Sequence, residues 1–122
     1  MTLQELYKEM GADYAMASRV LRVEKLIDKH IRKFADNEVI KKLLAAGENM
    51  DPTELFENAH AAKGVCSNLG LSKLAVLVTD ISEEFRPGSP RTRSDDEVRE
   101  ILGKVKETYE LSVSKIRQYI GG

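Results

Sequence analysis

One segment of the chain places a histidine, a lysine and a glycine within one helical turn. His60 is followed three and four positions later by Lys63 and Gly64. An unperturbed histidine has a pKa of about 6.5, so the neutral imidazole, a nucleophile, is abundant near pH 7. A phosphoryl group on such a ring would carry roughly −1.5 to −2 charges, as on other phosphorylated residues. The lysine can partly neutralise that charge, and the glycine leaves space for a bulky reaction partner.

Helical geometry indicates which way this histidine points. At about 100° per residue, the apolar positions of the segment gather roughly 180–240° away from His60. These positions are Leu55, Ala62, Cys66 and Leu69. They predict a core face on the opposite side of the helix, so we expect His60 to face solvent and Cys66 to act as a small buried hydrophobe.

Other side chains share the predicted exposed side with His60, among them Phe56, Glu57 and Ser67. Ser67 can donate a hydrogen bond to a phosphoryl oxygen. Phe56 can anchor a docked partner, because aromatic residues are favoured at interfaces, or it can pack beneath a neighbouring helix. Glu57 falls on the predicted partner-binding face. A glycine inside a helix costs about 0.5–1 kcal/mol relative to alanine, so Gly64 fits a position that must stay open.

The element that must position these residues has clear boundaries. Asp51 is a good N-cap, Pro52 suits the first helical position, and Glu54 can reach back to the cap. Gly70 is typical of a helix end. The sequence therefore predicts a helix from residue 52 to residue 69.

The rest of the chain is also helical in pattern. Further helices are predicted over about 2–10, 14–21, 23–34, 39–47, 72–85 and 94–120. Thr2 with Glu5 and Ser94 with Glu97 fit capping boxes, and Ser72 can cap its helix. The Pro- and Gly-containing segment 86–93 is predicted to be a loop and the most mobile part of the chain.

These elements predict an all-α fold. Four substantial helices with apolar stripes and short links indicate an antiparallel four-helix bundle, with additional short helices at the N-terminus. A length of 122 residues favours a single domain over 1–122, with the core bundle at about 21–120. This length leaves no room for an ATPase domain as well.

Composition limits the classes of partner and compartment. The 19 basic and 20 acidic side chains give a net charge of −1, which argues against a nucleic-acid binder. No apolar run approaches the roughly 20 residues of a membrane span, and the N-terminus lacks the pattern of a signal peptide. The single cysteine, Cys66, excludes an internal disulfide and a cysteine zinc cage. Together these features predict a cytoplasmic protein.

The pattern His60-x-x-Lys63-Gly64, followed by Leu69-Gly70 and a leucine-rich helix, resembles the signature of histidine-containing phosphotransfer (HPt) domains. The resemblance extends over about residues 21–119. The sequence departs from the family pattern at Ala62, where a large aliphatic residue is usual. It implies a phosphorelay carrier without kinase activity or a cofactor of its own, and most simply a monomer. His60 would accept a phosphoryl group from a receiver-domain aspartate and pass it to another, with receiver domains of hybrid histidine kinases and response regulators as partners. The receiver would hold Mg²⁺.

Two other interpretations of this segment concern binding without phosphotransfer and a metal site. A helical interaction module that binds a receiver domain without phosphotransfer remains an alternative. Glu57 and His60 match the Glu-x-x-His spacing of di-iron bundles, but Ile27 stands three positions before His30, the only other histidine, so no metal site is expected. His30 itself falls within the apolar stripe of its helix and is predicted to lie in the core or at its boundary.

Overall fold

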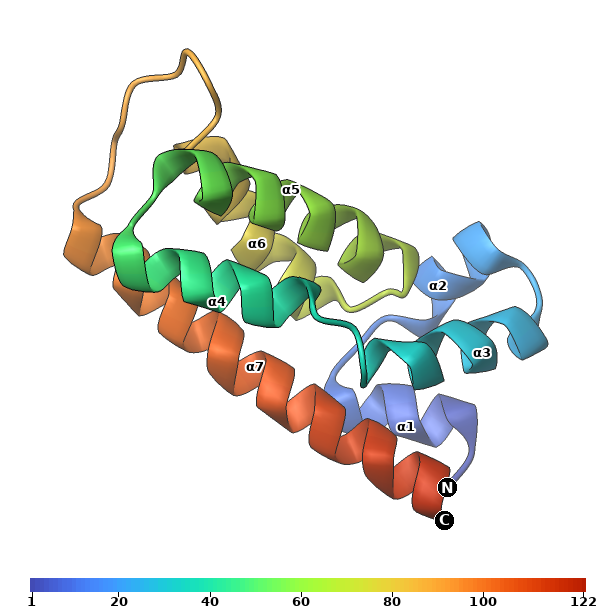
Figure 1. Ribbon diagram of the computed structural model, residues 1–122. Coiled ribbons are helices and arrows are strands. Elements are labelled where there is room, and N and C mark those ends of the chain that lie inside the picture. Colours follow the sequence, from blue (N-terminus) through green and yellow to red (C-terminus); the bar gives the residue numbers. More distant parts are fainter.

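The computed structural model describes residues 1–122 as seven helices without a strand, which confirms the all-α prediction. Short connections join most of the helices, and the two chain ends lie close together (Figure 1). The helices are α1 (Leu3–Met10), α2 (Tyr14–Leu21), α3 (Glu24–Phe34), α4 (Val39–Asn49), α5 (Pro52–Asn68), α6 (Ser72–Glu84) and α7 (Asp95–Gly121).

Both predicted capping boxes are present. The side chain of Thr2 accepts a hydrogen bond from the backbone of Glu5, whose carboxylate accepts from the backbone N–H of Thr2. Ser94 and Glu97 repeat this arrangement at the start of α7. The long last helix therefore begins at the residue that its sequence indicates.

Two other predicted helix starts differ in detail. Asp51 caps α5 by accepting from the backbone N–H groups of Thr53 and Glu54, at 3.0 and 3.1 Å, but the Glu54 side chain does not reach back. Ser72 is the first residue of α6 and not its cap, because Leu71 occupies the N-cap position without a side-chain hydrogen bond. The helix thus begins one residue too early for the Ser72 hydroxyl to cap it.

The longer helices pack around a shared core. α4 contacts α5 and α7, α5 contacts α6, and α6 contacts α7. α7 runs the length of the molecule, with α1 beside its C-terminal part (Figure 1). α2 packs against α3 and α5, and α3 packs against α7. None of the helices combines the length and apolar character needed to cross a membrane.

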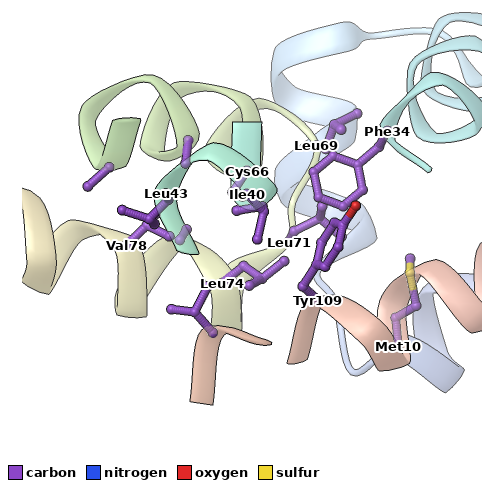
Figure 2. Close-up of a cluster of buried hydrophobic side chains, with 14 of the residues drawn as sticks. Met10, Phe34, Ile40, Leu43, Cys66, Leu69, Leu71, Leu74, Val78 and Tyr109 are labelled. Carbon is purple, nitrogen blue, oxygen red and sulfur yellow. The ribbon is translucent and has the colours of Figure 1, made fainter. Parts of the chain in front are cut away.

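A single cluster of 29 buried hydrophobic residues fills the interior. Figure 2 shows part of it, where Phe34 meets Tyr109 edge to face at a centroid distance of 5.9 Å. Leu55, Ala62 and Cys66 of α5 are fully buried in this cluster, as the helical projection predicted. Burial of this side fixes the rotation of α5 and leaves its opposite side exposed.

His30 does not lie in the core, contrary to the sequence prediction. It is exposed, whereas Ile27, Ile31 and Phe34 form the buried side of α3. The physical reason is that α3 packs mainly against α2 and α7 and buries a narrow stripe. Leu26, one turn before His30, is 40% exposed.

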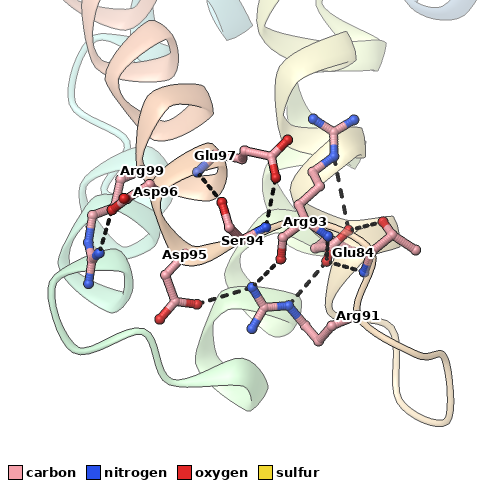
Figure 3. Close-up of polar contacts among 9 residues, drawn as sticks. Glu84, Arg91, Arg93, Ser94, Asp95, Asp96, Glu97 and Arg99 are labelled. Carbon is pink, nitrogen blue, oxygen red and sulfur yellow. Dashed lines mark hydrogen bonds and ion pairs between the residues drawn. The ribbon is translucent and has the colours of Figure 1, made fainter.

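The second half of the segment predicted to be mobile is anchored by Glu84. This buried carboxylate accepts hydrogen bonds from the backbone N–H groups of Thr92 and Arg93, the Thr92 hydroxyl and the Arg91 guanidinium, at 2.7–3.1 Å (Figure 3). Arg91 also lies over the ring of Phe85, 4.6 Å from its centroid. Residues 91–93 are therefore fixed to the end of α6, and residues 86–90 project from it as a loop.

Candidate functional site

α5 presents the candidate site on its solvent side. Its buried residues are Leu55, Ala59, Ala62 and Cys66. His60 is exposed on the opposite side, together with Glu57 and Gly64. The predicted orientation of His60 is thus confirmed, since α5 packs through its other side against α4 and α6.

Phe56 lies directly against His60. The two rings stack with a centroid distance of 5.5 Å and an interplanar angle of 19°. Phe56 is half-buried and packs against the hydrophobic core, whereas His60 is exposed. The phenylalanine is therefore held by the core and in contact with the histidine, and its role as an anchor for a docked partner stays a prediction.

Lys63 and Ser67 follow Phe56 along the same flank of α5. Positions 56, 63 and 67 fall within about 40° of one another on the helix, to one side of His60. Both side chains are half-buried, Lys63 forms no ion pair, and the Ser67 hydroxyl makes no hydrogen bond within the chain. The ammonium and hydroxyl groups are consequently uncommitted beside the imidazole.

Gly64 and Glu57 lie on the other flank of the histidine. A Cβ atom added to Gly64 would meet no atom within 4 Å beyond its own helix. The glycine therefore leaves open space one turn from His60 and is not required by close packing. Glu57 is exposed and forms no ion pair, so its carboxylate is free to contact a docked molecule.

The imidazole has no reaction partner within the chain. Neither ring nitrogen of His60 forms a hydrogen bond to another residue, and no carboxylate orients the ring as a base would be oriented in a catalytic triad. Cys66, also on α5, is fully buried, and burial raises the pKa of its thiol to about 12. His60 is an exposed nucleophile without a partner in the chain, so any reaction at it needs a second molecule.

A cleft of about 290 Å³ lies near the C-terminal end of α5 and was not foreseen from the sequence. It is lined by residues from α2, α3, the α3–α4 connection and α5, including His30, Lys33 and Asn68. Because these elements are far apart in the chain, no local pattern could indicate the cleft.

Comparison with protein-family models, curated proteins and solved structures finds no match for this chain. The case for a function therefore depends on the geometry around His60.

Proposed function

We propose that this protein is a phosphorelay carrier that accepts a phosphoryl group on His60 from a receiver-domain aspartate and passes it to the aspartate of another receiver. One observation carries the proposal: His60 is an exposed nucleophile on a well-packed helix, with open space at Gly64 and an unpaired Lys63 one turn away. The resemblance of this segment to HPt domains supports the same function.

The chemistry requires little from the carrier beyond these groups. A neutral imidazole nitrogen attacks the phosphorus of the partner's aspartyl phosphate, a P–N bond forms, and the P–O bond to the aspartate breaks. The aspartate leaves as a carboxylate, and the proton on the other ring nitrogen passes to solvent. Lys63 offsets part of the phosphoryl charge, and Ser67 donates a hydrogen bond to a phosphoryl oxygen. The reverse reaction delivers the group to the next receiver.

The remaining reactive components belong to the partner in this proposal. The receiver supplies the second reacting carboxylate and holds Mg²⁺, which stabilises the charge of the transferring group. The carrier has no kinase activity of its own and acts as a cytoplasmic monomer. The contacts among α4, α5, α6 and α7 support a four-helix bundle as the scaffold, with α1, α2 and α3 flanking it.

Substitution of the histidine tests the proposal. His60→Gln should abolish acid-labile labelling by a phosphorylated receiver domain, whereas His30→Gln, the matched control at the other exposed histidine, should keep it. Receiver domains from the same genome provide the donors, and circular dichroism checks that both variants fold. Label retained on His60→Gln would contradict the assignment. Binding of a receiver without any label on the wild type would instead identify a pure interaction module.

A further inference from the structure

An exposed stripe runs along α3 toward the cleft. Leu26, His30 and Lys33 fall within about 60° of one another on the helix, Val23 is the N-cap before them, and all four are exposed. Val23 is 52% exposed and Leu26 is 40% exposed. Large apolar side chains at such exposure, next to one another and beside cations, are typical of an interaction surface.

The C-terminal half of the stripe lines one side of the cleft. His30 and Lys33 are cleft residues as well as stripe residues. Apolar side chains contributed by three elements make up half of the lining, and two asparagines add hydrogen-bonding groups at positions 37 and 68. The apolar residues are Leu21, Phe34, Val65 and Leu69. The cleft thus suits one apolar side chain of a partner, whose neighbouring polar atoms can hydrogen-bond to the polar residues of the lining.

The cleft is close enough to His60 to lie under the same partner. Asn68, which lines the cleft, follows His60 by eight residues on α5, a distance of about 12 Å along the helix axis. A standard interface covers about 800 Å² on each partner, equivalent to a disc of about 16 Å radius. An interface of this size centred on His60 reaches Asn68, at the edge of the cleft.

The charge of this region indicates an acidic partner. Residues 19–33 contain six basic side chains and two acidic ones, Glu24 and Asp28, in a chain whose net charge is −1. The basic residues are Arg19, Arg22, Lys25, Lys29, Arg32 and Lys33. Asp28 is already paired with Arg32 and with the hydroxyl of Tyr119, so Glu24 is the one acidic side chain here without an ion pair, against five basic ones.

We infer that the α3 stripe and the cleft form the docking surface that selects the receiver domain reacting with His60. The inference rests on the proposed function, because the occupant is the same receiver. An apolar side chain of the receiver enters the cleft, and its carboxylates contact Lys33 and the neighbouring cations. A concave cleft favours this occupant over an anionic membrane, since a flat lipid surface leaves the cleft unfilled.

Charge reversal and apolar replacement on the stripe test the inference. The probe is the receiver domain that exchanges phosphate fastest with the wild type, and its dissociation constant is measured by titration calorimetry at low and high salt. Leu26→Asp and Lys33→Glu should each raise the dissociation constant about tenfold or more, as expected for central interface residues. The matched control is Leu111→Asp on α7, where the leucine is 49% exposed, and this variant should bind normally.

A small-molecule phosphodonor, which needs no docking surface, tests the reactivity of His60 separately from receiver binding. Phosphoramidate transfers its phosphoryl group to the imidazole with loss of ammonia, and all three variants should react like the wild type. Normal reaction with weakened receiver binding in the two α3 variants supports the docking surface. Equal binding by Leu26→Asp, Lys33→Glu and Leu111→Asp overturns it and leaves the carrier function intact. Loss of binding to phosphatidylserine vesicles, with receiver binding unchanged, would instead overturn it in favour of a membrane surface.

Discussion

The aromatic ring of Phe56 stacks on the imidazole of His60, with 5.5 Å between the centroids and 19° between the planes. The two residues are four positions apart on α5, the spacing at which helical side chains meet. Since Phe56 is held by the core, its ring forms a fixed platform beneath an otherwise unrestrained imidazole. The stack limits the orientations in which His60 meets an incoming phosphoryl group.

Removal of the platform should be visible in the histidine spectrum. Ring current from Phe56 should place the imidazole protons of His60 upfield of those of His30, which forms no aromatic pair. In Phe56→Leu this difference should disappear, phosphotransfer should slow severalfold, and stability should fall by about 0.5–1.5 kcal/mol, the usual value of an aromatic pair. Proton NMR measures the shifts. Unchanged His60 resonances in the variant would show that the rings do not stack in solution.

Replacement of Gly64 should separate stability from access. Gly64→Leu should raise the free energy of unfolding by about 0.5–1 kcal/mol, because leucine is a better helix former and its Cβ atom would meet no atom within 4 Å. The same side chain occupies the approach to His60, so transfer from a phosphorylated receiver should be blocked. Urea denaturation and phosphotransfer assays measure the two effects.

A matched control exists at Gly103 on α7, where an added Cβ also meets no atom within 4 Å. Gly103→Leu should give a similar gain in stability and leave transfer unchanged. If both variants transferred at the wild-type rate, open space at Gly64 would have no role in docking.

Glu84 should make stability depend on pH in the acid range. Burial opposes its ionisation, but hydrogen bonds from the backbone of Arg93, from Thr92 and from Arg91 outweigh burial and lower its pKa to about 2. Because the pKa is lower in the folded state, ionised Glu84 stabilises the protein above about pH 5, and this contribution is lost as pH falls toward 2. Glu84→Gln should therefore cost about 1–3 kcal/mol near pH 7 and progressively less at lower pH.

Denaturation at pH 7, 5 and 3 measures this contribution. The control is Glu83→Gln, which removes an exposed carboxylate paired with Arg86 on the protein surface and should have a small effect. A constant difference between Glu84→Gln and the wild type across this range would contradict the assigned cause.

Cys66 should be chemically inert in the folded protein. Its thiol is fully buried, and burial raises its pKa to about 12, so little thiolate is present and reagents cannot reach it. A thiol-specific chromogenic disulfide should react with the native chain only as fast as it unfolds and should react at once in denaturant. Rapid labelling of the native chain would mean that α5 unfolds locally around Cys66.

Local sequence signals determined most of the secondary structure. Capping residues and helical periodicity indicated all seven helices, and the capping boxes at Thr2 and Ser94 appear where they were expected. The errors fell where a contact with another element decides the outcome. Ser72 does not cap α6, and the segment before Ser94 is anchored by Glu84, whose hydrogen-bonding partners lie seven to nine residues away.

The candidate site shows the same division. The sequence by itself placed His60 on the exposed side of α5, because one helix and its apolar residues suffice to define a core face. Only the tertiary structure decided the rest: the solvent exposure of His30, the anchoring of Phe56, and the cleft where α2, α3 and α5 meet. The physical reason is that periodicity along one helix reports which side is buried, whereas a cleft is made by the packing angles of several helices.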